Sequence, residues 1–301
     1  MDLERFKGGA AYVRGSFVPM NEATVSVADW GLTRSDAVYD VVHVRDGRFF
    51  RLNDHVERFE SAMARRRLDV GMTAEQIRAV LHRVVSLSGL SAAYVAMVAL
   101  RGRPQVVGSR RPEDCDNHLV AYAVPWVDVI SKAVQETGAT LWISEHPRVP
   151  DACVDPSVKN YQWSDLTTGL FEAHDNGYET AVLCDAHGFV TEGPGFNVFM
   201  VKDGAVTAPD RGALPGITRR TVLELCEELR IPHSTSAIPR SALEEADEIF
   251  VSSTAGGVMP IAKVSGGRTL KGPAGEVFQA LRDAYWLTHQ RSDYSTPVEH
   301  V

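Results

Sequence analysis

The longest uninterrupted apolar run in the chain, the nine residues Ala92–Leu100, restricts the fold more than any other feature. It is far shorter than the roughly 20 residues that cross a bilayer as a helix. A run of this length predicts a strand buried on both faces, so the rest of the chain must cover a sheet. With 301 residues, the chain is long enough for a sizeable core and favours two domains.

Two hairpins are predicted ahead of this strand. Residues Ala10–Val18 alternate in polarity around Gly15. Val41–Arg45 and Arg48–Arg51 flank Asp46-Gly47, a dipeptide that favours two-residue hairpin turns. Both segments are therefore expected to be β-structure.

Two amphipathic helices are also predicted, each with a capping residue. Asn53 is placed to cap a helix that runs to about Leu68, and Thr73 opens a second helix that runs to about Ser88. Arg58 lies on the inward face of the first helix. An inward arginine needs an anion, which is either a structural carboxylate or a phosphate.

The proline-led stretch Pro125–Ser131 is predicted to connect two domains. We expect an N-terminal small domain over residues 1–124, an interdomain linker over 125–136 and a larger C-terminal domain over 137–301. Residues Gln290–Val301 are expected to be a loose tail.

In the second half, the stretch Asp155-Pro-Ser-Val-Lys-Asn-Tyr-Gln-Trp-Ser-Asp165 combines a lysine with a helix start. Pro156 closes off any earlier helix, so Lys159 lies where extended chain becomes helix. The helix is predicted to bury residues at three- and four-residue steps, namely Trp163, Leu166, Leu170 and Phe171. A lysine among apolar side chains can lose its proton and form a Schiff base with a carbonyl compound, whereas most lysines near helix starts are simply solvated.

Three further features accompany this lysine. Glu192 stands in a strand-like segment beside two glycines, which let other groups approach the backbone closely. Two loops, Gly216-Ile-Thr218 and Ser253–Gly257, combine N–H groups with hydroxyls, as a phosphate cradle does. Thr218 is also placed to cap a helix from about Arg219, which is the plainer interpretation of the first loop.

Composition and absent motifs narrow the function. The net charge of 31 − 39 = −8 disfavours nucleic acid, and no basic cluster suggests a membrane surface. The four cysteines are widely spaced and fit reduced thiols better than disulfides or a metal site. The N-terminal residues show no secretory signal, so we expect the protein in the cytoplasm. No Walker, dinucleotide, zincin or serine-hydrolase motif occurs. One cofactor, pyridoxal 5′-phosphate, needs a reactive lysine, a carboxylate for its ring nitrogen and a phosphate cradle.

With these residues in place, the chain resembles the fold-type IV (class IV) pyridoxal-phosphate aminotransferases, which include the branched-chain and D-amino-acid aminotransferases. Within that class it resembles the (R)-selective amine transaminases most. The resemblance runs from about Gly9 to His289. It rests on four stretches in order, Asp155 to Asp165, Glu192-Gly-Pro-Gly-Phe-Asn197, Leu214-Pro-Gly-Ile-Thr-Arg219 and Thr254-Ala-Gly-Gly-Val-Met-Pro260.

The resemblance implies roles for individual residues. Lys159 is implied to be the Schiff-base lysine and proton shuttle, and Glu192 to pair with the pyridine nitrogen. The implied phosphate-binding residues are Arg58, Ile217 (through its backbone), Thr218 and Thr254. The implied substrate-pocket residues are Arg34, Tyr39, Val41, Tyr94, Ala96, Trp163 and Ala255. It also implies an α+β fold, with a smaller N-terminal α/β domain and a C-terminal pseudo-barrel that binds the cofactor, and a homodimer.

Two departures from the family pattern bear on the substrate. Ala96 stands where many amine transaminases have a glutamate and where branched-chain enzymes tend to have an arginine. The acceptor carboxylate has four candidate partners, Arg34, Arg103, Arg110 and Arg111. The implied reaction is a ping-pong transfer of an amino group from an (R)-amine or D-amino acid to a 2-oxo acid such as pyruvate. The alternatives are a branched-chain or D-amino-acid aminotransferase, a lyase of the aminodeoxychorismate type and a non-catalytic cofactor-binding protein.

Overall fold

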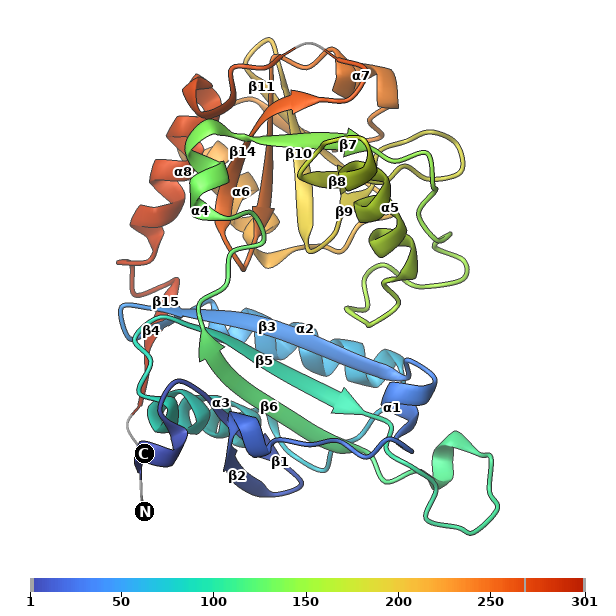
Figure 1. The fold of residues 1–301 in the computed structure, drawn as a ribbon. Coiled ribbons are helices and arrows are strands. Elements are labelled where there is room, and N and C mark those ends of the chain that lie inside the picture. Colours follow the sequence, from blue (N-terminus) through green and yellow to red (C-terminus); the bar gives the residue numbers. More distant parts are fainter. Residues whose placement is uncertain (1–2, 268, 300–301) are drawn as a thin grey trace. The chain divides into compact units, whose positions relative to one another are not determined.

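The computed structural model describes residues 3–267 and 269–299, which form two compact units (Figure 1). Unit 1 comprises the chain through Val127, the short segment Val158–Tyr161 and the chain from His289 on. Unit 2 comprises Asp128–Ser157 and Gln162–Thr288. The units are therefore not continuous along the chain, unlike the linear division predicted from the sequence, because two distant segments bond to the N-terminal strands.

Unit 1 is built on an antiparallel sheet in the order β15-β4-β3-β5-β6-β1-β2. Its strands are β1 (Ala10–Val13), β2 (Ser16–Pro19), β3 (Ala37–Arg45), β4 (Arg48–Phe50), β5 (Ala93–Leu100), β6 (His118–Pro125) and β15 (Ser295–Pro297). The central strand β5 pairs with β3 and β6 and is almost wholly buried, so the predicted buried strand is confirmed. Both predicted hairpins, β1–β2 and β3–β4, are confirmed as well.

Part of the predicted loose tail is instead a strand. Ser295–Pro297 pairs with β4, and the N–H of Val298 donates to the carbonyl of Gly47 at 2.9 Å. The side chain of Arg48 donates to the hydroxyl of Ser295 at 2.9 Å. Without β15, β4 would leave unpaired backbone groups at the sheet edge, and the tail satisfies them.

Two helices, α2 (Leu52–Arg65) and α3 (Ala74–Ser88), cover one face of this sheet and share a core with it (Figure 1). A capping box at Thr73 confirms the predicted start of α3. The predicted cap at Asn53 is wrong, since Arg51 is the N-cap with a left-handed φ of 53° and Leu52 already turns into the core. The remaining helices of unit 1 are α1 (Trp30–Thr33) and the 3₁₀ helices η1 (Leu3–Phe6), η2 (Met20–Glu22) and η3 (Pro112–Asp114).

Unit 2 holds a mixed sheet in the order β12-β11-β10-β13-β14-β7-β8, with β9 paired to β10. Its strands are β7 (Ala139–Ile143), β8 (Thr180–Val182), β9 (Glu192–Gly193), β10 (Phe196–Lys202), β11 (Ala205–Pro209), β12 (His233–Ser236), β13 (Glu248–Ser253) and β14 (Gly257–Val264). Its helices are α4 (Lys132–Thr137), α5 (Ser164–Asp175), α6 (Ile217–Glu228), α7 (Arg240–Glu244), α8 (Glu276–Thr288) and the 3₁₀ helix η4 (Gly272–Ala274). Apolar side chains of the strands form a core of its own.

The buried stripe of α5 differs from the predicted one. Helix α5 buries Leu166, Gly169 and Ala173, whereas Phe171 is 65% exposed. A Cβ added at Gly169 would lie 2.7 Å from a methyl group of Leu183. The helix therefore packs closely through its small residues, and the larger Phe171 is turned outward.

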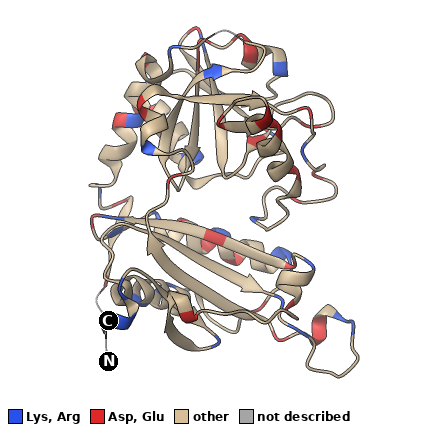
Figure 2. Cartoon of the chain, viewed as in Figure 1, with Lys and Arg blue, Asp and Glu red and all other residues tan. Residues whose placement is uncertain are grey.

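Charged residues of both signs occur in each unit (Figure 2). Within residues 3–267 and 269–299, no helix is long and apolar enough to cross a membrane. The same part of the chain contains no group of three or more His, Cys, Asp or Glu side chains arranged to hold a metal ion.

Candidate active-site residues

Lys159 is held in unit 1 by its main chain. The N–H of Tyr39 donates to the carbonyl of Lys159 at 3.0 Å, and Val38 and Asn160 form an antiparallel bridge beside it. Val158 is buried in the core of unit 1. The Lys159 amino nitrogen lies 4.5 Å from the centroid of the Tyr39 ring, and no other described residue gives it a hydrogen bond or an ion pair. The result is an amine on a fixed backbone with no carboxylate of its own.

Strands β3 and β5 bring four predicted pocket residues to one face of the unit 1 sheet. Val41 is the register partner of Ala96, and side-chain alternation places Tyr39 and Tyr94 on the same face. These side chains belong to one apolar cluster, which Tyr122 on β6 joins.

Two tyrosines that the sequence did not single out for the pocket, Tyr161 and Tyr122, pack against the predicted pocket residues. The ring of Tyr161 stacks on that of Tyr39 with centroids 4.4 Å apart, and Tyr122 stacks on Tyr94 at 6.5 Å. Burial, followed by the neighbouring tyrosines, raises the pKa of Tyr161 and of Tyr94. Their hydroxyls therefore stay protonated and can act as hydrogen-bond donors.

Arg58 points inward, as predicted, and it contacts a carboxylate. Its Nε and Nη2 donate to the two carboxylate oxygens of Asp40 at 2.7 and 2.9 Å. Asp40 is fully buried, and the Nδ1 of buried His55 lies 2.7 Å from Asp40 Oδ1. The structural alternative for Arg58 is thus present, and phosphate binding by Arg58 stays a prediction.

The His55–Asp40–Arg58 group predicts sensitivity to acid. Burial acts to raise the pKa of Asp40, but Arg58 and His55 hold it well below its ordinary value of 3.8. Burial lowers the pKa of His55 from its ordinary 6.5 more than Asp40 raises it. The unfolded chain therefore binds protons at these groups before the folded chain does, and stability is lost as the pH falls.

We expect the free energy of unfolding to fall as the pH drops below about 6.5, by up to about 1.4 kcal/mol per pH unit for one histidine. His55→Gln should flatten this slope between pH 7 and pH 5, because glutamine does not titrate. Urea unfolding at several pH values measures it. An unchanged slope in His55→Gln would show that another group causes the loss.

Glu192 is buried in unit 2 at 8% exposure and held from two sides. Arg148 Nη2 donates to Glu192 Oε1 at 2.9 Å, and the N–H of Leu214 donates to Oε2 at 2.9 Å. Arg148 Nη1 also donates to Asp165 at 2.6 Å. One guanidinium thus joins two carboxylates, and both oxygens of Glu192 are held as acceptors.

The first predicted phosphate loop forms the start of α6. Helix α6 begins at Ile217 with Gly216 as N-cap, so Thr218 lies in the first turn and the prediction that it caps a helix from Arg219 is wrong. No side chain of the N-cap bonds to this first turn, because glycine has none. The backbone of Gly216 lies so close to Asn197 that a Cβ there would clash with Asn197 Oδ1, so glycine is required at this position.

The second predicted phosphate loop is the turn between β13 and β14. The hydroxyl of Ser253 donates to the carbonyl of Gly195 at 2.7 Å and accepts from the N–H of Ala255 at 3.1 Å. Gly256 and Gly257 have φ values of 137° and 71°, which favour glycine. Thr254 is therefore presented on a turn of fixed shape.

Trp163, the last predicted pocket residue, precedes α5 in unit 2. It is the N-cap residue of that helix and is partly buried. A Cβ added at Gly195 would lie 3.6 Å from the Trp163 ring. Trp163 and the Ser253–Gly257 turn therefore both approach Gly195 within unit 2.

The four candidate arginines for an acceptor carboxylate differ in their surroundings. Arg34 is exposed, with its guanidinium carbon 3.2 Å from the centroid of the Trp30 ring. The Nε of Arg111 lies 3.8 Å from Oε2 of Glu113. Arg103 and Arg110 are exposed on the loop between β5 and β6.

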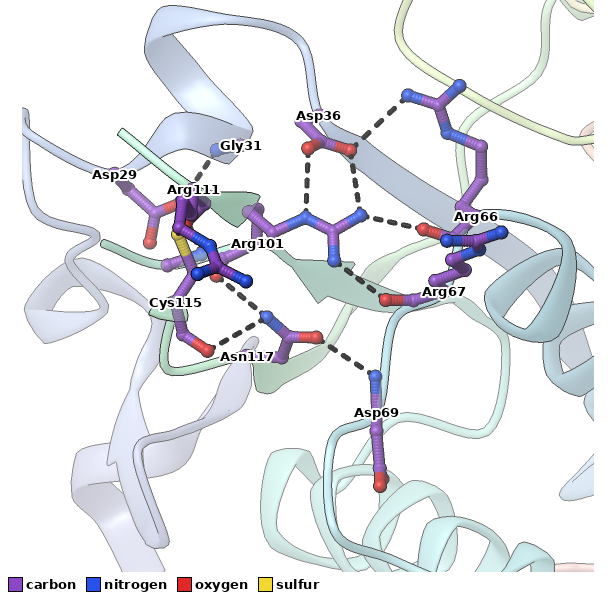
Figure 3. A network of polar contacts seen from close by, with 11 residues as sticks. Asp29, Gly31, Asp36, Arg66, Arg67, Asp69, Arg101, Arg111, Cys115 and Asn117 are labelled. Carbon is purple, nitrogen blue, oxygen red and sulfur yellow. Dashed lines mark hydrogen bonds and ion pairs between the residues drawn. The ribbon is translucent and has the colours of Figure 1, made fainter. Parts of the chain in front are cut away.

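A buried network anchors that loop at both ends (Figure 3). Arg101, 5% exposed, donates to both carboxylate oxygens of Asp36 at 2.8 and 3.3 Å and to the carbonyls of Arg66 and Arg67 at 2.7 Å each. Asn117 Nδ2 donates to the carbonyl of Arg101 at 2.9 Å. The network also satisfies backbone carbonyls just beyond the end of α2.

The chain matches the family model of the class IV amino-transferases over residues 37–264, and it belongs to this family. A putative branched-chain-amino-acid aminotransferase of Methanocaldococcus jannaschii is 28% identical over 277 residues, which cover 91% of this chain and 94% of that protein. A D-alanine aminotransferase of Staphylococcus haemolyticus is 27% identical over 285 residues, which cover 91% of this chain and 95% of that protein.

The fold has a close counterpart among solved structures. The branched-chain aminotransferase of the thermophilic archaeon Thermoproteus uzoniensis with norvaline superposes with a TM-score of 0.84 at 27% identity, covering 96% of this chain and 99% of that one. The predicted family, α+β fold and aminotransferase class are confirmed. Class IV aminotransferases use pyridoxal 5′-phosphate, so the predicted cofactor is confirmed as well. The closer resemblance to (R)-selective amine transaminases stays a prediction.

Three polar residues that support the candidate site were not predicted. Arg148 holds Glu192 and is itself held by Asp165, and Asp40 holds Arg58. A signal for Asp40 existed, because it is a lone carboxylate among the valines of β3. Arg148 lies in a loop with no periodic pattern and gave no comparable signal.

Proposed function

We propose that the protein is a pyridoxal-phosphate transaminase that moves an amino group from an (R)-amine or a D-amino acid to a 2-oxo acid such as pyruvate. The observation that carries the proposal is the amine of Lys159, which has a fixed main chain and no carboxylate partner among the described residues. A lysine that served in an ion pair would instead have a carboxylate beside its amine. By the family resemblance, the protein works as a homodimer.

The residues present fit the cofactor. Lys159 offers an amine, and Glu192 offers an ionised carboxylate braced by Arg148. The uncapped first turn of α6 offers N–H groups to a phosphate, and only glycine fits at its N-cap. Each of these groups corresponds to one functional group of pyridoxal 5′-phosphate.

When bound, pyridoxal 5′-phosphate supplies an aldehyde for an amine and a ring that takes up electrons. Lys159 would hold the cofactor through that aldehyde. The amine of Lys159 would also take up and return the proton of the donor's α-carbon. The bond between Tyr39 N–H and Lys159 O keeps the backbone in place while the four-carbon side chain moves.

Glu192 and Arg58 have binding roles in this scheme. Glu192 would accept a charge-assisted hydrogen bond from the ring nitrogen, and Arg148 keeps the carboxylate in position. Arg58 and the first turn of α6, with Ile217 and Thr218, bind the phosphate. Thr254 adds a hydroxyl from its turn.

The donor preference rests on the pocket face of β3 and β5. Tyr39, Val41, Tyr94 and Ala96 present apolar surface and hydroxyls, and Ala96 adds no negative charge. A donor with an apolar group fits this face, and a donor carboxylate meets no buried glutamate at position 96. We therefore expect activity with small (R)-amines such as 1-phenylethylamine, and measurable activity with D-alanine.

A donor panel with pyruvate tests the preference. Initial rates with (R)-1-phenylethylamine and D-alanine should exceed those with (S)-1-phenylethylamine and L-leucine. The second candidate function, a branched-chain aminotransferase, is favoured by the names of the similar proteins described above. L-Leucine as the best donor would establish that function in place of the proposed one. Release of pyruvate from a substrate without any amino acceptor would indicate a lyase.

A further inference from the structure

A buried carboxylate stands in the middle of an otherwise apolar strand face in unit 1. On β3, Val38, Asp40 and Val42 alternate toward the core that α2 and α3 cover, and each is fully buried. A third valine would fill the position of Asp40 without the cost of burying a charge, and buried ion pairs are weak contributors to stability. The position of Asp40 therefore needs another explanation than stability.

Asp40 constrains one guanidinium and is itself held in place by other contacts. Arg58 Nε and Nη2 donate to its two oxygens at 2.7 and 2.9 Å, a two-pronged geometry that fixes the plane of the guanidinium. The N–H of Val41 and the Nδ1 of His55 both lie 2.7 Å from Asp40 Oδ1. Because an ionised carboxylate only accepts, these contacts hold Asp40 itself in one rotamer.

Consecutive residues of β3 thus hold two groups that the proposed function assigns to the cofactor. Tyr39 holds the main chain of Lys159 at 3.0 Å, and Asp40 holds the side chain of Arg58. A shift of the Tyr39–Lys159 contact would move the amine relative to β3, and a shift of the Asp40–Arg58 contact would move the guanidinium relative to the same strand. Fixing the guanidinium in advance also reduces the entropy lost when a phosphate binds.

We propose that Asp40 and His55 are positioning residues that orient Arg58 toward the phosphate of the cofactor. The inference rests on the proposed function, in which Arg58 binds that phosphate. It predicts that loss of Asp40 weakens phosphate recognition even though Asp40 cannot contact a phosphate favourably. The opposite result follows if Asp40 merely competes with the phosphate for Arg58.

The test compares pyridoxal 5′-phosphate with pyridoxal, which lacks the phosphate, in absorbance titrations of the full chain. The ratio of the two association constants, phosphorylated over unphosphorylated, measures phosphate recognition alone. Arg58→Ala should lower this ratio about 30-fold, the equivalent of a lost charged hydrogen bond. Asp40→Asn and His55→Gln should lower it about 10-fold and about 3-fold, and Asp40→Asn should add little in the Arg58→Ala background, since it acts through Arg58.

Asp36→Asn is the matched control, because Asp36 forms the same two-pronged contact with Arg101. It should lower stability and leave the ratio unchanged. Arg58→Lys keeps the charge but loses the two parallel hydrogen bonds of the guanidinium, so it should also lower the ratio. This variant replaces Asp40→Asn as the test if Asp40→Asn does not fold.

The inference would be overturned by an unchanged or higher ratio of association constants in Asp40→Asn, or by a ratio in Arg58→Lys equal to that of the wild type. An unchanged ratio in Arg58→Ala would overturn it together with the phosphate role of Arg58. Pyridoxal binding at Lys159 is scored separately, so its loss alone would count against the proposed function instead.

Discussion

Replacing Lys159 with alanine is expected to lower the transamination rate by about four orders of magnitude, because in the proposed function one side chain both binds the cofactor and moves the proton. The backbone of residue 159 should stay in place, since its carbonyl accepts from Tyr39 N–H whatever the side chain. Folding should therefore survive the change. A small added amine such as methylamine should restore part of the rate, because it can move the proton that Lys159 no longer moves.

The matched control is Lys263→Met. The amino nitrogen of Lys263 also lies over a tyrosine ring, 5.1 Å from the centroid of Tyr178, but Lys263 is exposed on β14. Its replacement should leave the rate within a factor of about two, as expected for a surface substitution.

Borohydride reduction gives an independent readout on the wild type. The purified protein should be yellow, and reduction should fix the cofactor mass on the peptide that contains Lys159, one of six lysines in the chain. A label on any other lysine would show that Lys159 is not the binding residue.

Local sequence signals predicted the parts of unit 1 that depend on neighbouring residues. The Asp46-Gly47 turn set the β3–β4 hairpin, and the Thr73 capping box set the start of α3. The predicted start of α2 failed, because Arg51 takes a left-handed conformation that short polar side chains and glycine favour more. The sequence offers no pattern for such a residue.

The supporting shell of the candidate site depends on distant pairs. Arg148 and Glu192 are 44 positions apart, and Asp40 and Arg58 are 18 apart on different elements. Periodicity reports only on faces of a single helix or strand, so it cannot identify such partners. Lys159 and Glu192 were singled out by their local sequence and given roles by the family resemblance, but the residues that hold them became visible only in the fold.

The exposure of Phe171 shows the same limit for packing. Its spacing fits the apolar stripe of α5, but the close approach of Gly169 to Leu183 rotates the contact onto small residues. Which of two adjacent stripes faces a sheet is decided by the partner surface, and that surface is built from β7 and β8. Hydrophobic spacing alone does not contain this information.

Glu192→Gln is expected to keep the cofactor bound but to lower turnover about 100- to 1,000-fold in both half-reactions, on the scale of losing one preorganised electrostatic partner. Glutamine has nearly the same shape, but its amide nitrogen donates. Toward Arg148 Nη2 or toward Leu214 N–H, that nitrogen would meet another donor. If the amide oxygen faces Arg148, the amide nitrogen faces Leu214, so no orientation satisfies both contacts.

In the proposed function, loss of the carboxylate also removes the negative charge that would keep the ring nitrogen protonated, and with it much of the ring's capacity to take up electrons. The comparison is Glu248→Gln, since Glu248 is also buried and accepts from the N–H of Phe278 at 2.9 Å at the start of α8. That change should lower the free energy of unfolding by about 1–3 kcal/mol and leave turnover nearly unchanged. Single-turnover absorbance traces with donor alone and with acceptor alone separate the two half-reactions. Near-normal rates in Glu192→Gln would mean that the ring does not depend on Glu192, and that the pair with Arg148 serves the fold of unit 2 instead.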